Sequence, residues 1–459
     1  MPRANRQASA FTGAGFCGTL LACAALAAAL GSAPAKAADD EAKLSGESDS
    51  KRWWQGGDDG VTLPGVFADW HLYQKDGFRI DRSDASLKLK FNASLWLDAG
   101  DIGANDALET AFPGYPGQTV EFSRARVTMR GRAFDAGDFK FQVELAQKPQ
   151  VKDSWFRFNP VPYLGRIRVG NMREPYSLEN STSGGNLTFM SRSLPTLALA
   201  PGRNIGIATT NTAFDQRLTW SAGYFWNTAS YANFGGAQDA LSNSIGIDFV
   251  ARVTGLARYA HGGRDLIHLG LSLAHQRFHD QIQVRAVPET ALTDDSLVDT
   301  GKFQPERAVN INPEFVVVAG PWSFQAEYFH EAFKYPGAGN PRLKGIYAFG
   351  SYILTGESRH YDRAAGVFDG VRPKRNFRWG SSGWGAWEVA LRLSHVDLND
   401  GALGGGRQTD LTAGLNWYIN EDSRLMFNFV YGRVKGRSNP PPIDGGRTNI
   451  LQARFQIDF

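Results

Sequence analysis

The sequence predicts an all-β fold, a transmembrane antiparallel β-barrel of about sixteen strands, and three observations lead to it. The chain opens with a segment typical of export, polar and apolar residues alternate in long stretches, and the last strand ends on Phe459. The chain has 51 glycines, 30 phenylalanines and 12 tryptophans, yet beyond its first residues it has no apolar run long enough for a spanning helix. Lumen-facing polar residues dilute the hydropathy of barrel strands, so this combination is typical of barrels.

The first residues fit a secretory signal peptide. Arg3 and Arg6 are followed by an apolar stretch and by Ala35-Lys36-Ala37, small residues at the positions that signal peptidase reads. We expect removal of residues 1–37, a short periplasmic segment over 38–76, and a barrel over 77–459. A retained membrane helix is an alternative, although the apolar stretch is short of the ~20 residues that a span needs. Lipidation at Cys23 is a second alternative.

Cysteine and charge restrict the chemistry further. Cys17 and Cys23 are the only cysteines, so the expected mature chain has no thiol, which excludes disulfides, metal–thiolate sites and a cysteine nucleophile. The formal net charge of +3 includes Arg3, Arg6 and Lys36, and the expected mature chain is therefore close to neutral. Any function that depends on charge must come from segregation of charge.

Strand-like alternation runs from one end of the chain to the other. Between Leu87 and Leu97 every second residue is apolar, and the same period of two recurs in 139–146, 267–274, 411–418 and 451–459. Segments of about ten residues suit tilted barrel strands, whereas the alternative, a soluble β-sandwich, has strands of about five or six residues. We predict that Phe459, at the end of an amphipathic strand, is a signal for the outer-membrane assembly machinery.

The parity of each strand predicts which charges face the lumen. Arg124, Arg126, Arg130 and Arg132 share one face of a strand, ~7 Å apart. The same inward parity is carried by Lys88, Lys90, Lys140, Arg157, Arg166, Arg168, Arg217, Arg252, Arg392 and Arg454. Inward acids are fewer, so we expect a basic lumen that suits oxyanions, because planar guanidinium groups bind them and pass them on. As an alternative, individual arginines pair with inward acids or with lipopolysaccharide phosphates.

Three stretches resemble the phosphate-selective porin O and P family. They are GNMREPYSLENSTSGGNLTFMSRSLPTLALAPGRNIG (Gly170 to Gly206), SYILTGESRHYD (Ser351 to Asp362) and GWGAWEVALRLSHVDLND (Gly383 to Asp400). The resemblance implies a sixteen-stranded trimeric barrel, an inward-folded loop that forms a constriction, and anion passage guided by arginine ladders and lysines.

The loop between Asn171 and Gly202 is too apolar for a freely solvated loop, which agrees with burial inside the barrel; packing against a neighbouring subunit is the alternative. The candidate constriction residues are Arg173, Glu174, Arg192 and Arg203. Lys148, Lys152, Lys334, Lys344 and Lys374 are candidates for a central lysine cluster.

We therefore expect a porin in the outer membrane of a Gram-negative bacterium, for passive diffusion of small anions such as phosphate. A general porin, or one for aromatic or organic anions, is the runner-up, because Trp96 and Phe225 have lumen-facing parity. An outer-membrane enzyme lacks support, because no Gly-x-Ser-x-Gly elbow is present and only His275 and His279 lie four apart. An adhesin would need long repetitive loops. We expect no catalytic residue, cofactor, metal or nucleic acid, and as partners inorganic anions, membrane lipid and lipopolysaccharide, the assembly machinery and two further copies of the chain.

Overall fold

The computed structural model describes residues 61–459 except 63–69, 75–77, 83, 85, 116, 134–135, 147–148, 228–245 and 381. The expected signal peptide, most of the expected periplasmic segment and the candidate Lys148 lie outside the described residues. No helix in the described part of the chain is long and apolar enough to span a membrane.

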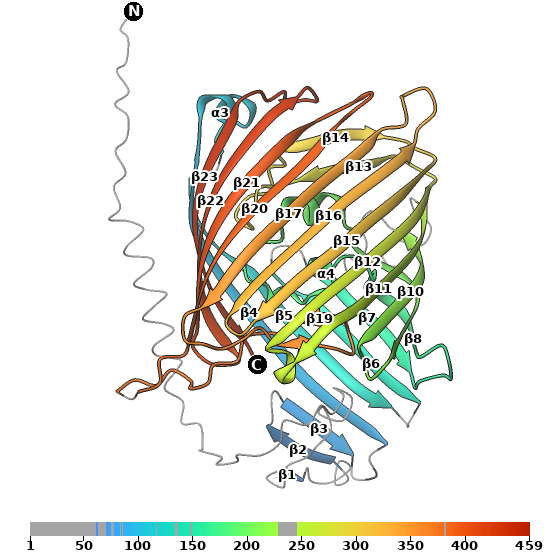
Figure 1. The fold of residues 1–459 in the computed structure, drawn as a ribbon, viewed down its shortest axis with the longest axis vertical. Coiled ribbons are helices and arrows are strands. Elements are labelled where there is room, and N and C mark those ends of the chain that lie inside the picture. Colours follow the sequence, from blue (N-terminus) through green and yellow to red (C-terminus); the bar gives the residue numbers. More distant parts are fainter. Residues whose placement is uncertain are drawn as a thin grey trace, which may run out of the picture.

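Sixteen antiparallel strands of the described chain close into a barrel (Figure 1), as the sequence predicts. Each strand pairs with the next, and β23 pairs with β4 through partners such as Arg454 and Asp98. Closure leaves every strand with two neighbours, which satisfies the backbone groups in lipid. The strands are β4 (Leu87–Ala104), β5 (Gln118–Ala133), β6 (Gly137–Glu144), β7 (Gln150–Phe158), β8 (Arg166–Arg173), β9 (Arg203–Ala213), β10 (Leu218–Asn227), β11 (Gly246–Ala260), β12 (Asp265–Phe278), β15 (Arg307–Ala319), β16 (Trp322–Lys334), β17 (Arg342–Ile353), β20 (Ala386–Asp400), β21 (Leu403–Tyr418), β22 (Ser423–Arg437) and β23 (Gly446–Asp458).

The alternation seen in the sequence fixes which side chains face lipid. Along β15, exposed and buried side chains alternate, so Ile311 and Phe315 point outward while Asn312 and Glu314 are buried inside. Outward residues are apolar because lipid surrounds the barrel, and inward residues are polar because the lumen holds the hydrogen-bonding partners. The strands therefore form because the period of two matches the pleat of the sheet.

Strand β5 carries a bulge that changes its parity. Trp96 of β4 pairs with Arg124 and the next residue, Leu97, pairs with Phe122, which leaves Ser123 as an extra residue. Val120 and Phe122 before the bulge, and Val127 after it, are all exposed on the outer face. The inward arginine row therefore begins at Arg124, immediately after the bulge.

Most of the short turns lie at one end of the barrel, which also holds one long connection between β17 and β20. The C-terminus lies at the end with most of the short turns (Figure 1), which we take as periplasmic because periplasmic turns are typically short. At this end β1 (Val61–Thr62), β2 (Trp70–Gln74) and β3 (Phe78–Arg82) extend the sheet beyond the barrel, since β3 pairs with the lower part of β4. Arg217, expected in the lumen, instead lies exposed in the turn before β10, because its strand begins one residue later.

Three connections fold into the barrel. The constriction loop, residues 174–202, contains α4 (Leu178–Ser181), the 3-10 helix η2 (Gly184–Asn186) and α5 (Leu194–Leu199). The β13–β14 loop, residues 279–306, contains β13 (Ile282–Ala286) and β14 (Val298–Phe303). The periplasmic insert, residues 354–385, contains β18 (Tyr361–Asp362) and β19 (Val367–Phe368). The helix α3 (Asp106–Ala111) and the 3-10 turn η3 (His261–Gly263) lie at the two rims.

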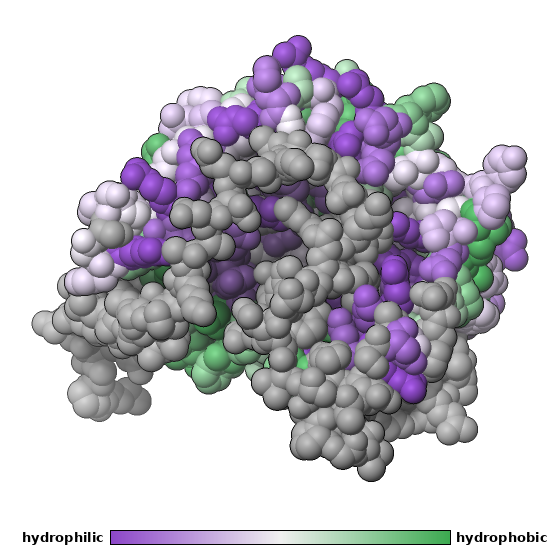
Figure 2. All heavy atoms as spheres, turned by 90° about the horizontal axis from the view of Figure 1, so that it is seen from below, coloured by the Kyte–Doolittle hydropathy of each residue, from purple (hydrophilic) through white to green (hydrophobic). Residues whose placement is uncertain are grey.

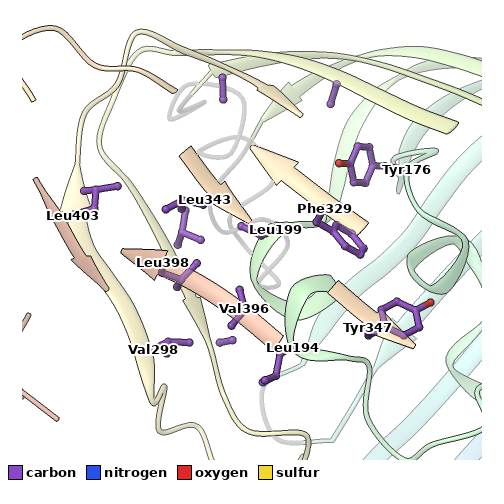
Figure 3. Packing of buried hydrophobic residues seen from close by; sticks show 14 of the residues in the cluster. Tyr176, Leu194, Leu199, Val298, Phe329, Leu343, Tyr347, Val396, Leu398 and Leu403 are labelled. Atoms are coloured by element: carbon purple, nitrogen blue, oxygen red, sulfur yellow. The ribbon is translucent and has the colours of Figure 1, made fainter. Parts of the chain in front are cut away.

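These connections give the barrel an apolar core on one side of the lumen. Leu194 and Leu199 of α5 belong to the same buried cluster as Leu343 of β17 and Val396 of β20 (Figure 3). Val298 of β14 joins this cluster from the other inward loop. The two loops thus pack against the inner face of β17 and β20.

Candidate anion path and constriction

Cationic side chains gather on the strands from β5 to β9, which we call the basic wall. Its members are Arg124, Arg126, Arg130, Arg132, Lys140, Lys152, Arg157, Arg166, Arg168 and Arg203. Seen from the periplasmic end, hydrophilic side chains gather inside the rim of the barrel (Figure 2). The wall thus contains all the predicted anion-path residues except Lys88 and Lys90, which lie beside it on β4.

The sheet register places cations of the wall directly opposite one another. Arg130 lies between Lys90 on β4 and Lys140 on β6, so three cations form a row across three strands. Further facing pairs are Lys88 with Arg132, Arg157 with Arg168, and Arg173 with Arg203. Like charges that face each other across strands destabilise a sheet, so this arrangement is costly for the fold alone.

Three carboxylates moderate this charge. Glu144 lies 2.9 Å from Arg126, Asp138 lies 2.7 Å from Arg157 and 3.2 Å from Arg132, and Asp153 bridges Lys140 and Arg203. The alternative that individual arginines pair with inward acids therefore holds on this wall for Arg126, Arg132, Arg157 and Arg203. The partners come from β6 and β7, which alternation within β5 alone does not reveal.

The constriction loop is fastened to the opposite wall by its own backbone carbonyls. Arg424 donates to the carbonyl of Leu187, Arg454 to that of Met190, and Asn416 to that of Thr188, at 2.8–2.9 Å. Each hydrogen bond satisfies a loop carbonyl that would otherwise be buried without a partner. The loop therefore holds a fixed course along β20 to β23.

A buried ion triad joins the constriction loop to the second inward loop. Arg392 of β20 lies 3.2 Å from Glu179 of α4 and 2.5 Å from Glu289 of the β13–β14 loop. All three side chains are almost completely buried. Glu289 also accepts hydrogen bonds from Ser394 and from Thr412. Arg392 thus holds two loops in place, and its charge, which the two carboxylates neutralise, does not contribute to a basic lumen.

Glu327 of β16 fixes the start of α4. Its two carboxylate oxygens accept the backbone N–H groups of Leu178 and Glu179 at 3.0 and 2.8 Å. The first N–H groups of a helix lack partners within the helix, and a carboxylate there is favourable. Sequence parity places Glu327 in the lumen, and its partner in the structure is a helix start instead of a solute.

Arg192 is the cation that the constriction loop presents to the basic wall. Its guanidinium donates to the backbone carbonyls of Thr182 and Glu179, and it lies in the electrostatic field of Arg203 and Arg126. Burial, with the repulsion of these two arginines, lowers the pKa of Arg192 to about 10, so it stays cationic at neutral pH. Arg192 therefore adds a cation from the constriction loop to the side of the lumen where Arg126 and Arg203 pair with Glu144 and Asp153.

The other predicted constriction residues have structural partners. Arg173 donates to Asn180 of the loop, and Glu174, which is buried, accepts from Asn204 at 2.5 Å. On the wall, Gly184 of the loop approaches Arg124 so closely that a Cβ atom would lie 2.8 Å from its guanidinium nitrogen. The loop thus approaches the wall closely at Arg124.

Aromatic residues occupy two places on the lumen face. Trp96 lies between Arg124 and Arg454, whose guanidinium carbons are 3.2 and 4.4 Å from its ring centre, and Phe225 is fully buried. Trp155 was not singled out in the sequence, yet its ring lies 4.5 Å from the guanidinium of Arg168. Trp155 and Arg157 lie two residues apart on one strand, and this spacing is the sequence signal that places both side chains on the same face of β7.

Of the remaining lysine candidates, Lys152 belongs to the basic wall, where Arg203 and Arg126 contribute to its electrostatic field. Lys334, at the end of β16, pairs with Glu306, and Lys374 lies in the periplasmic insert. Lys344 lies on β17, opposite Asp397. The candidates therefore do not come together as one cluster among the described residues.

Comparisons with known proteins agree with this architecture. The sequence profile of the family described as phosphate-selective porin O and P matches residues 89–459. Porin O of Pseudomonas aeruginosa is 22% identical over 436 residues, which cover 86% of this chain and 94% of its own. A protein of Caulobacter vibrioides described as uncharacterized is 28% identical over 391 residues, covering 82% of this chain and 74% of its own.

Among solved structures, the trimer form of OmpT, an outer-membrane protein of Vibrio cholerae, superposes with a TM-score of 0.50 at 10% identity. The match covers 82% of this chain and all of that one, and supports the barrel fold. Because the family profile spans most of the sequence and the strands close into a sixteen-stranded barrel, the chain belongs to the phosphate-selective porin O and P family and forms a porin channel in the outer membrane of a Gram-negative bacterium.

Proposed function

We propose that this porin conducts small anions, phosphate or related oxyanions, along the basic wall. The observation that carries the proposal is the row of facing cations, Lys90, Arg130 and Lys140, on three neighbouring strands. Natural sheets rarely keep facing like charges unless they serve a purpose, because each pair costs stability. Three cations gathered on one stretch of the lumen face attract mobile anions.

Along the basic wall, the cationic side chains outnumber the carboxylates that pair with them. Arg124 and Arg126 share Glu144, while Arg192 donates only to neutral carbonyls. Cations in a partly dehydrated lumen act more strongly than in bulk water and raise the local concentration of anions. Several moderate sites in sequence favour passage, because no single site retains the solute.

The decisive measurement is the reversal potential of single channels in a KCl gradient at low salt. We expect the double variant Arg126→Gln with Arg192→Gln to lower the anion-over-cation permeability ratio several-fold. Arg433→Gln is the matched control, because Arg433 is exposed on β22 with outward parity and its loss removes the same charge outside the lumen. At 1 M salt the Debye length is ~3 Å and the difference should disappear. Unchanged ratios in the double variant at low salt would contradict the proposal.

Phosphate preference needs a competition experiment. Inorganic phosphate added to a chloride-conducting channel should reduce the current, and the same double variant should need more phosphate for the same reduction. Arginine binds phosphate through paired hydrogen bonds, so a variant with Lys at both positions should keep anion selectivity and lose part of the phosphate block. If phosphate reduced the current equally in all variants, the channel would be a general anion porin without a preference for phosphate.

A channel for aromatic anions is the second candidate, and Trp155 favours it. Its ring lies beside the guanidinium groups of Arg168 and Arg157, an arrangement that suits stacking of a benzoate-like anion. Block by benzoate that exceeds block by phosphate, and that is lost in Trp155→Ala, would support this candidate.

We also propose that the channel is a homotrimer, because the solved structure that it resembles is described as a trimer form. Native mass spectrometry of the detergent-extracted protein tests the subunit number. The same spectrum gives the mature mass, and a chain beginning at Ala38 would support the predicted removal of residues 1–37. Contacts with lipopolysaccharide and with the assembly machinery remain predictions.

A further inference from the structure

A second group of cations lies at the periplasmic end, on segments outside the basic wall. The η3 turn between β11 and β12 and the periplasmic insert line a cavity of about 190 Å³ that is open to solvent. Its lining contains the cations Arg264, Arg359, Arg372 and Lys374 together with His360, and Glu357 is the one carboxylate in the lining. None of these residues belongs to the proposed anion path.

The single carboxylate is already engaged within the insert. Glu357 accepts hydrogen bonds from the hydroxyl of Thr355 and from the backbone N–H of Lys374 at 3.0 Å. Among the described residues, no carboxylate oxygen lies within 4.0 Å of the charged nitrogens of Arg264, Arg359, Arg372 or Lys374. The nearest acid to His360 is Asp369, at 3.5 Å. The cavity therefore carries more positive charge than the protein neutralises.

Most of these cations are held in place by neutral partners. Lys374 donates to the carbonyl of Gly356 at 2.9 Å, and Arg264 donates to the same carbonyl at 3.4 Å. Arg359 is buried, donates to Gln325 at 3.1 Å and lies over the ring of Phe368. These contacts fix the positions of the side chains without removing their charge. A cationic site that is preorganised in this way binds anions at low entropic cost.

We propose that this cavity is a binding site for a phosphoryl group, presented either by free phosphate or by the headgroup of a phospholipid at the periplasmic rim. Cations that converge from two segments suit an anion with several oxygens, and guanidinium groups bind such oxygens in pairs. The volume equals roughly six water molecules, which admits a phosphate with a small substituent. The site retains its ligand and does not conduct it, because it lies beside the insert instead of along the wall.

The most informative variant is Arg372→Gln. Within the described part of the chain Arg372 has no hydrogen bond or ion pair, so its replacement should leave the fold unchanged. Arg375→Gln is the matched control, because Arg375 is exposed, contacts only Ser382 through its side chain and does not line the cavity.

Isothermal titration of the full-length protein in detergent with inorganic phosphate, at low salt, is the first measurement. We expect the wild type and R375Q to share one phosphate site per chain that R372Q binds at least tenfold more weakly, since a charged hydrogen bond contributes ~1.5–3 kcal/mol. The reversal potential of R372Q should equal that of the wild type, so failure of this site and failure of the proposed anion path give different results.

The second measurement repeats the titration in nanodiscs that contain phosphatidylglycerol. A headgroup that occupies the cavity should prevent the phosphate from binding there in the wild type, whereas a free-phosphate site should titrate as it does in detergent. Equal phosphate binding by wild type, R372Q and R375Q in detergent would overturn the proposal. An equal loss in both variants would do so too, because it would reflect net charge alone.

Discussion

Inward arginines differ in what surrounds them. Arg252 and Arg454 each bind a carboxylate through two hydrogen bonds, to Glu314 and to Asp98, at 2.6–2.8 Å, and are almost fully buried. Arg126 is mostly buried and pairs with Glu144, whereas Arg192 donates to backbone carbonyls of its own loop. Strand parity assigns Arg126, Arg252 and Arg454 to the lumen alike, and it does not show which of them a carboxylate neutralises.

Arg392 should be the most costly of the inward arginines to remove. Arg392→Met leaves Glu179 and Glu289 buried without their cation, and a broken buried ion pair costs about 3–5 kcal/mol. We expect the denaturant midpoint of the detergent-solubilised barrel to fall clearly. Arg407→Met is the control, because Arg407 is 57% exposed where it pairs with Asp397, and such pairs contribute at most about 1 kcal/mol. Similar midpoints for both variants would mean that the triad does not hold the loops.

A substitution of Phe459 should change the assembly of the barrel and leave the stability of the folded barrel nearly unchanged. Its backbone N–H and carbonyl both pair with Ala93 of β4, and its side chain is exposed. Phe459→Ala keeps both backbone hydrogen bonds, so the folded barrel should lose little stability, whereas the amount assembled in cells should fall. Phe459→Tyr should restore it. Normal membrane levels of the Ala variant would remove the case for an assembly signal.

The sequence predicts which residues line the proposed path, but it does not predict which ion-pair partners those residues have. Alternation places Arg124, Arg126 and Arg130 on one face of β5, and all three lie on the lumen side. Alternation also gives Glu144 inward parity, but it does not show that Glu144 pairs with Arg126, because the two lie on neighbouring strands and only the sheet register brings them together. It also overestimates the basic lumen, since the partners of Arg392 lie in loops that have no period.

Elements of two kinds build the channel, strands that form the barrel and connections that fill part of it. The constriction loop is predictable, because its apolar residues are unsuited to solvent. The inward course of the periplasmic insert is not, because its polar residues read as an ordinary loop. Only the folded barrel brings Tyr361 within 2.7 Å of His268 and the carbonyl of Gly366 within 2.8 Å of Arg252.

Shortening the insert should widen the periplasmic side of the channel. Strands β17 and β20 are hydrogen-bonded neighbours, with Ile353 opposite Glu388, so a short turn can replace residues 357–383 without breaking the sheet. We expect higher single-channel conductance from a barrel that still folds, because side chains of the insert no longer occupy the lumen. Deletion of the exposed residues 378–380 is the control and should leave conductance unchanged. An unchanged conductance in the shortened protein would show that the insert does not limit flow.

At the scale of the whole molecule, charge is divided across the lumen. The basic wall occupies β5 to β9, and buried carboxylates such as Glu314, Glu327 and Glu331 lie on the opposite strands. The chain as a whole carries a formal charge of only +3, so the proposed anion path depends on this separation. Alternation and composition predict the closed barrel, because they follow from lipid outside and polar groups inside.

The closed barrel should also be heat-modifiable. A closed ring of hydrogen-bonded strands resists detergent, so unboiled protein should migrate differently from boiled protein on a denaturing gel. The variant Arg392→Met should change from the mobility of the unboiled protein to that of the boiled protein at a lower temperature than the wild type. Identical mobility before and after boiling would be incompatible with a closed barrel.

The buried triad of Arg392, Glu179 and Glu289 has an electrical consequence. Both inward loops share one cation, so neither loop can shift without displacing the anchor of the other. Independent flickering of two loops would superimpose two sets of current steps on an open channel, whereas coupled loops produce one. The recorded current of the wild-type channel should therefore be quiet, and its power spectrum should gain a second component only when the shared cation is removed.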